Sequence, residues 1–133
     1  PQYNSNSGVF LQSKYELQVL DSYQNPTFVN GQAGSIYKQH APLVNSSKKP
    51  GEWQSYEIIF NAPKFKNDQL IKPAFFTVFQ NGVLIQNHVE VQGATTNVGF
   101  PKYNAHKNLP LVLQDHPSLP ISFRNIWIRK IND

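Results

Sequence analysis

Apolar and polar residues alternate along much of the chain in short runs, a pattern typical of half-buried β-strands. No stretch keeps a helical period together with capping residues, so the pattern predicts no helix. Turn-forming Gly, Pro and Asn residues separate the runs, as in a sandwich, jelly roll or barrel. The predicted strands are Gly8–Gln12, Tyr15–Tyr23, Gly34–Lys38, Glu52–Phe60, Ala74–Gln80, Val83–Val91, Leu111–Asp115 and Ile121–Ile131.

The connections between these strands carry their own signals. Asn81-Gly82 predicts a tight hairpin, and Ser13-Lys14 is short enough to predict another. Pro63–Pro73 is basic and proline-bounded, and we expect a loop there. Gln92–Leu109 is long and rich in Gly, Asn, Thr and Lys, and a loop of that length is usually a functional rim or lid.

The order of the strands leaves one edge of the expected sandwich incomplete, since they begin almost at the first residue. A two-sheet sandwich of this kind should have more strands before Asn6. We expect those strands to lie outside this chain or to come from a second protein chain. Residues 1–133 are therefore interpreted as a single domain, the C-terminal two-thirds of a larger one.

Composition excludes several classes of protein. The net charge is +4, but only 15% of residues are charged and the longest basic run is Lys48-Lys49, so nothing indicates nucleic-acid binding. There is no cysteine, and hence no disulfide or thiolate metal site. No apolar run is long enough to predict a membrane span. Phosphate-binding glycine loops, HExxH and nucleophile-elbow motifs do not occur.

The strand Tyr15–Tyr23 carries the most polar chemistry. Strict alternation places Glu16 and Gln18 on one face and Asp21 on the other. A bulge between Gln18 and Asp21 would turn all three to the same side, and bulges often lie next to active sites. Two carboxylates and an amide on one strand suit acid/base chemistry on a sugar. The alternative is a half-exposed strand with a solvated face.

Seven stretches, in order over nearly the whole chain, carry a family resemblance: Asn6–Leu11, Tyr15–Tyr23, Gly34–Lys38, Lys49–Phe60, Asn81–His88, Pro110–His116 and Phe123–Ile128. Together they resemble the 3-keto-disaccharide hydrolase domain family, a jelly-roll fold related to concanavalin-like lectins and glucanases. The resemblance implies an all-β, two-sheet antiparallel jelly-roll sandwich.

The resemblance also implies an activity, the cleavage of 3-keto-glycosides. A base removes the acidified hydrogen at carbon 2, the aglycone leaves from carbon 1, and water adds to the unsaturated sugar. Our candidates for catalysis, and for binding one divalent metal ion if the reaction uses it, are Glu16, Asp21 and His116. Candidates for substrate binding are Gln18, Tyr37, Lys38, Asn87, Gln114 and Arg124. Asn87 is either a buried structural residue or a sugar contact, and Trp127 is expected in the core.

Two other functions compete with this one. The chain could be a non-catalytic carbohydrate-binding module, or an accessory subunit of a larger glycan-processing assembly. It could also be a conventional glucanase, because the strand is similar to the Glu-x-Asp-x-x-Glu motif of retaining enzymes. Gln18 replaces the middle carboxylate of that motif, which argues against double displacement. The family also implies a periplasmic or secreted location.

Overall fold

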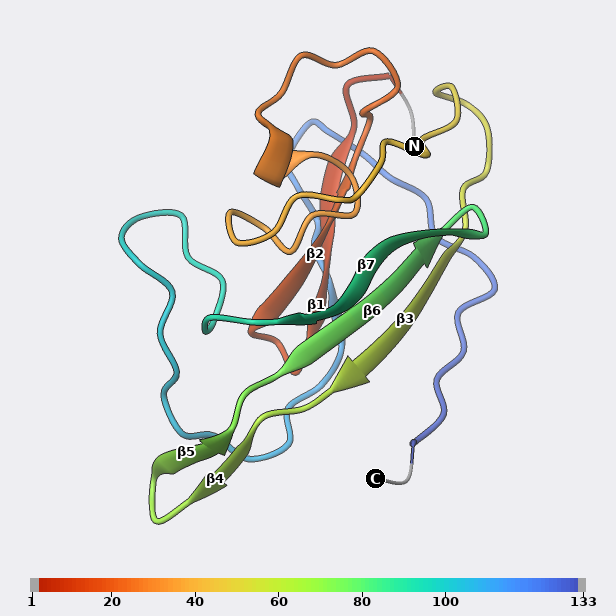
Figure 1. Ribbon diagram of the computed structural model, residues 1–133. Coiled ribbons are helices and arrows are strands. Elements are labelled where there is room, and N and C mark those ends of the chain that lie inside the picture. Colours follow the sequence, from red (N-terminus) through yellow and green to blue (C-terminus); the bar gives the residue numbers. More distant parts are fainter. Residues whose placement is uncertain (1–2, 132–133) are drawn as a thin grey trace.

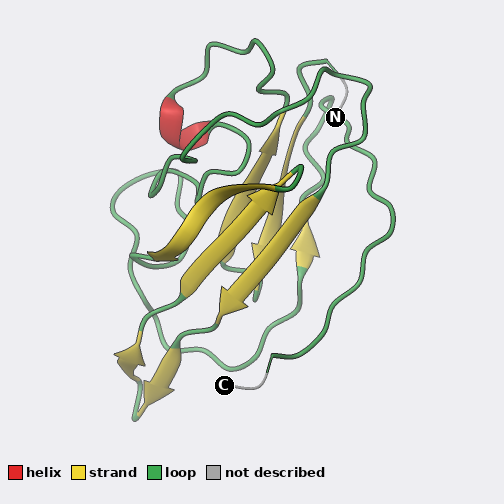
Figure 2. Cartoon of the chain, turned by 45° about the vertical axis from the view of Figure 1, so that its right-hand side comes forward, coloured by secondary structure: helices red, strands yellow, loops and turns green. Residues whose placement is uncertain are grey.

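The chain forms a jelly-roll sandwich of two antiparallel sheets, as predicted (Figure 1). The computed structural model describes residues 3–131. One sheet has the order β2-β1-β8 and the other β3-β6-β7, and Figures 1 and 2 show them as two stacked layers. Within residues 3–131, no helix could cross a membrane. The strands of the first sheet are β1 (Asn6–Leu11), β2 (Tyr15–Leu20) and β8 (Val112–Leu113), and those of the second are β3 (Tyr56–Asn61), β6 (Phe75–Gln80) and β7 (Val83–Glu90).

Both predicted hairpins are confirmed. β1 pairs with β2 in one continuous register, from Asn6 opposite Leu20 to Leu11 opposite Tyr15. β6 pairs with β7 through Asn81 and Gly82, whose φ angles of 54° and 79° are those of a tight two-residue turn.

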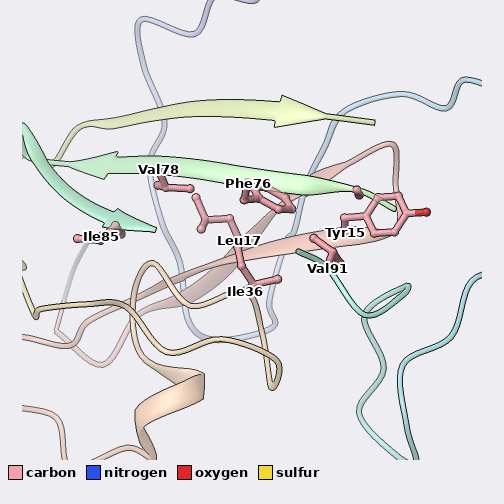
Figure 3. Close-up of a cluster of buried hydrophobic side chains, with 8 residues drawn as sticks. Tyr15, Leu17, Ile36, Phe76, Val78, Ile85 and Val91 are labelled. Atoms are coloured by element: carbon pink, nitrogen blue, oxygen red, sulfur yellow. The ribbon is translucent and has the colours of Figure 1, made fainter. Parts of the chain in front are cut away.

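The core lies between the two sheets. Tyr15 and Leu17 of β2 meet Phe76 and Val78 of β6, and each of the four is at most 1% exposed. Figure 3 shows Leu17 reaching from one layer toward the side chains of the other. Because alternate residues of β2 point to opposite faces, Glu16 and Gln18 lie on the side of the sheet away from this core.

The segment around Ile36 extends the first sheet beyond β2. Ile36 forms an antiparallel bridge with Leu17, the amide N–H of Gln18 donates to Ser35 O, and that of Tyr37 donates to Glu16 O. β2 is therefore hydrogen-bonded along both edges. The loop between β2 and this segment contains a short 3-10 helix, η1 (Val29–Gly31).

One loop prediction and one strand prediction are wrong. The predicted loop Pro63–Pro73 holds a small hairpin, β4 (Lys64–Lys66) with β5 (Gln69–Lys72), that projects from the sandwich (Figure 1). Asn67 and Asp68 form its turn, both with φ near 55°. The predicted strand Ile121–Ile131 is not a strand, because it pairs with no described segment. Trp127, which we expected in the core, is 75% exposed.

A bulge in β7 overturns a further expectation. Phe76 pairs with Val89 and Val78 with Gln86, so β7 has one residue more than β6 over this span. The extra residue reverses the alternation there, and His88 takes a φ of 48°. Gln86 is buried as a result and donates to the carbonyls of Gly34, His40 and Ala41. Asn87, predicted to point inward, is exposed.

Candidate functional site

The outer face of the first sheet gathers the polar side chains of three segments. In β1, Gly8 lies opposite Gln18 and Phe10 opposite Glu16. The ladder continues past β8, where the N–H of Gln114 donates to Gly8 O at 2.9 Å. Alternation therefore puts Gln114 on the same face, and His116 two residues further along it. The jelly-roll register, rather than proximity in sequence, brings these residues together.

The predicted bulge in β2 is absent, and this removes Asp21 from the face. The pairing with β1 stays regular to Leu20, and the N–H of Asp21 donates to Ser5 O at 3.0 Å. The Asp21 carboxylate is buried instead at the end of the strand. It accepts the N–H of Asn4 at 3.0 Å and that of Tyr23 at 3.4 Å. The Asp21 carboxylate therefore has a structural role, since it joins the residues just before β1 to those just after β2.

A cavity of about 270 Å³ opens over the face. Five of the residues that line it are candidates from the sequence analysis: Glu16, Gln18, Tyr37, Gln114 and His116. Among the cavity residues Glu16 is the only carboxylate. The lining consists of Asn6, Phe10, Glu16, Gln18, Tyr37, Thr95, Thr96, Asn97, Gln114 and His116.

Gly8 provides the space in which the Glu16 carboxylate lies. A Cβ at Gly8 would be 2.5 Å from Glu16 Oε1 and 2.9 Å from the Phe10 ring. Contacts that short do not occur, so any larger residue at this position would displace the acid. The glycine is therefore required by close packing across the strand pair rather than by its backbone conformation.

Glu16 titrates near neutrality. Its side chain is buried, and burial raises the pKa of the carboxyl from 4.5 to about 7 because the charged form loses its hydration. The pKa of Tyr37 is also raised, by burial and by the negative charge of Glu16 beside it. A carboxyl with such a pKa can both accept and release a proton at neutral pH, which is the property of a general acid/base.

An amide group lies next to this acid. With its nitrogen turned toward the carboxylate, the Gln18 amide donates to Glu16 Oε1 at 3.1 Å and to Ser7 O at 3.3 Å. We prefer this orientation because the reverse one points the amide oxygen at acceptor atoms, although its nitrogen then reaches Asn6 Oδ1 at 3.3 Å. Gln114 and His116 line the same cavity, so further hydrogen-bonding groups face it together with Glu16.

The long loop supplies residues that the sequence analysis missed. Its Thr95 is fastened to β2: the hydroxyl accepts the N–H of Glu16 at 3.0 Å, and the Thr95 N–H donates to Lys14 O at 2.8 Å. Thr95, Thr96 and Asn97 thereby form a wall of the cavity. The length of the loop indicated a rim, but nothing in the sequence indicated which of its residues would dock beside Glu16.

Three candidates for substrate binding lie away from the Glu16 cavity. Lys38 is exposed, and its Nζ donates to Asn97 O at 2.8 Å in an adjoining cavity. Asn87 lies on the bulge of β7 in the other sheet. Arg124 stacks on the Trp53 ring, with Cζ 3.8 Å from the ring centroid, and lines neither cavity.

The predicted metal ligands do not assemble. Glu16 and His116 line one cavity, while Asp21 is engaged with backbone amides at the end of β2. Over the part of the chain that the structure describes, no three His, Cys, Asp or Glu residues are close enough together to hold a metal ion. The donors around Glu16 are chiefly neutral amides and hydroxyls, which suit hydrogen bonding to a sugar.

Comparison with known proteins agrees with this architecture. The family model described as 3-keto-alpha-glucoside-1,2-lyase-like domain matches residues 1–129. The fold is similar to the crystal structure of a "putative glycosyl hydrolase" from Parabacteroides distasonis, with a TM-score of 0.83 and 51% sequence identity. The match covers 87% of this chain and 50% of that one, so the chain spans about half the length of its neighbour. No match was found among curated proteins.

Proposed function

The chain belongs to the family of 3-keto-alpha-glucoside-1,2-lyase-like domains, and we propose on this premise that it carries the active site of a 3-keto-glycoside hydrolase or lyase. One observation supports the proposal above all others. A buried carboxyl, Glu16, with a pKa of about 7 lies in a sugar-sized cavity, among amide, phenol and imidazole groups.

In the proposed reaction, the Glu16 carboxylate takes the proton from carbon 2 of the oxidised sugar. The electron pair forms the enolate of the 3-keto group, and the amides of Gln18 and Gln114, which both line the cavity, are our candidates to donate hydrogen bonds to that oxygen. The carbon 1–oxygen bond then breaks, and the leaving oxygen receives a proton from a cavity acid, for which His116 is our candidate. Water adds at carbon 1 and a proton returns to carbon 2, so that the net change is hydrolysis.

A single carboxylate suits this route better than double displacement. Retaining glycosidases need two carboxyl groups about 5 Å apart. Of the acids on or next to β2, Glu16 faces the cavity and Asp21 does not. Proton abstraction beside a ketone requires one base and a stabilised enolate oxygen, and no nucleophile.

The direct test compares a 3-keto-glucoside with its unoxidised parent, using the native protein that contains this chain. We expect cleavage of the keto sugar alone. Glu16→Gln should lower turnover by about 100-fold or more, since positioned proton transfer contributes that much. Glu57→Gln, an exposed carboxylate of β3, is the matched control and should leave turnover unchanged.

The pH profile gives a second readout. If Glu16 is the base, kcat/KM should rise with pH to a plateau above about 7, and this limb should vanish in the Gln variant. Cleavage of the parent sugar at a comparable rate would contradict the proposal. Binding of the keto sugar without cleavage would instead favour a carbohydrate-binding module.

A further inference from the structure

A second and larger cavity, of about 560 Å³, adjoins the Glu16 cavity. The two share Tyr37, Thr96 and Asn97 as a common wall. We propose that this second cavity binds the leaving group of the substrate, and that it selects flat aromatic aglycones over a second sugar. The inference rests on the proposed function, because the leaving group must lie next to the sugar that Glu16 deprotonates.

Two phenylalanines give the cavity its aromatic character. Phe100, in the long loop, is 94% exposed, and Phe28, just before η1, is 53% exposed. Figure 1 shows the long loop and η1 on the same side of the sandwich. Both side chains line the cavity, and their free ring faces offer stacking surface to a planar ring.

Local backbone structure sets the position of both residues. The Phe28 ring packs directly on Gly31, where any side chain would collide with it, and Phe28 O accepts the N–H of Gly31 at 3.0 Å. Gly99 precedes Phe100 with a φ of 83°, a conformation that favours glycine and turns the chain at that point. Both exposed rings therefore belong to defined internal turns of the chain and not to a chain terminus.

Several polar side chains of the cavity are already engaged with the loop itself. Lys38 Nζ donates to Asn97 O at 2.8 Å. Gln39 donates through Nε2 to Gly93 O at 3.0 Å, and its Oε1 accepts the N–H of Gln92 at 2.7 Å.

The Thr96 hydroxyl is likewise engaged, since it donates to Val98 O at 2.7 Å and accepts the Val98 N–H at 3.3 Å. A second hexose could stack only its C–H face on the free faces of the two phenylalanine rings, and its hydroxyls would have to compete with these existing hydrogen bonds for partners of their own. An aromatic ring requires only those faces, which are open. This contrast is the reason for preferring an aromatic aglycone.

The test uses three 3-keto-glucosides of one anomeric form, with benzyl, cyclohexylmethyl and methyl aglycones, and a 3-keto disaccharide, on the native protein. Benzyl and cyclohexylmethyl alcohols are similar in size and leaving ability, but only the first is flat. We expect KM for the benzyl compound to be about 10-fold lower than for either of the other two glucosides and lower than for the disaccharide. Phe100→Ala should remove that advantage without changing KM for the methyl compound. Val98→Ala, another exposed loop residue outside both cavities, is the matched control.

The outcomes separate the two proposals. Equal KM values for benzyl and cyclohexylmethyl, or no effect of Phe100→Ala, would overturn the aromatic site while cleavage still supports the proposed function. A lower KM for the disaccharide would assign the cavity to a second sugar. If no keto substrate is cleaved, calorimetric binding of the benzyl compound decides: binding weakened about 10-fold by Phe100→Ala supports the site, and no binding overturns it.

Discussion

Replacing Glu16 by glutamine should make the protein more stable at alkaline pH, although it removes the proposed base. In the unfolded chain the carboxyl ionises near pH 4.5, whereas in the folded protein it keeps its proton up to about pH 7. Between these values the native state binds one proton more than the unfolded state. The free energy of unfolding therefore falls as pH rises through this window, and the stabilisation present below pH 4.5 is lost above pH 7.

The size of the effect follows from the same two values. Moving one pKa from 4.5 to about 7 corresponds to roughly 3 kcal/mol, because each pH unit is worth about 1.4 kcal/mol. The carboxylate faces an open cavity, so partial hydration should reduce this to about 2 kcal/mol. The amide of Glu16→Gln has nearly the same shape and no charge to desolvate. We expect the variant to match the parent at pH 4.5 and to exceed it by about 2 kcal/mol at pH 8.

Urea denaturation followed by far-ultraviolet circular dichroism, at several pH values from 4.5 to 8, measures this difference. The exposed control Glu57→Gln should stay within about 0.5 kcal/mol of the parent throughout. Parallel stability curves for Glu16→Gln and the parent would show that the carboxyl titrates at its ordinary pKa, and would refute the reasoning.

Three other substitutions test separate parts of the structure. Gly8→Ala should lower turnover at least about 10-fold in the keto-glucoside assay, because its Cβ would lie 2.5 Å from Glu16 Oε1 and displace the acid; unchanged kinetics would mean that the carboxylate position is not critical. Asp21→Ala should cost about 1–3 kcal/mol in urea denaturation, since it leaves the N–H groups of Asn4 and Tyr23 without their acceptor, and should change kcat less than twofold; a large loss of kcat would return Asp21 to the site. Tyr103→Phe should cost a similar amount, because the hydroxyl donates to Val91 O at 2.6 Å and accepts the N–H of Ala74 at 2.8 Å, and a thermal midpoint equal to that of the parent would contradict this.

Local patterns were sufficient to predict much of the fold. Alternation predicted β2 and its polar face, and Asn81-Gly82 predicted the β6–β7 hairpin. Both features depend on residues that are neighbours in sequence. The β4–β5 hairpin was missed because its strands are short and its lysines resemble those of a solvated loop. The bulge expected in β2 is absent, and the bulge in β7 at Asn87 and His88 was not predicted, because the position of an extra residue depends on the partner strand.

The site was predictable only in part, for the same reason. Glu16 and Gln18 share a face by simple alternation, and Gln114 and His116 share one by the same rule. That the two pairs meet is decided by the pairing of β1 with both β2 and β8, which has no local signature. Thr95 contacts β2 and Arg124 contacts Trp53, although these residues are far apart in sequence. The alternation of polar and apolar residues along a strand cannot predict such contacts.

The double-edged pairing of β2 has a consequence for motion. The Gln18 N–H donates to Ser35 O, while the opposite edge of β2 pairs with β1, so the amide protons of this strand should exchange with solvent among the slowest in the protein. Glu16 therefore lies on a rigid strand, and we expect any adjustment to ligands of different shape to occur in the part of the long loop that carries Phe100. Changes near Phe100, away from the Thr95 contact with Glu16, can alter which molecules are accepted and leave the proton-transfer geometry as it was.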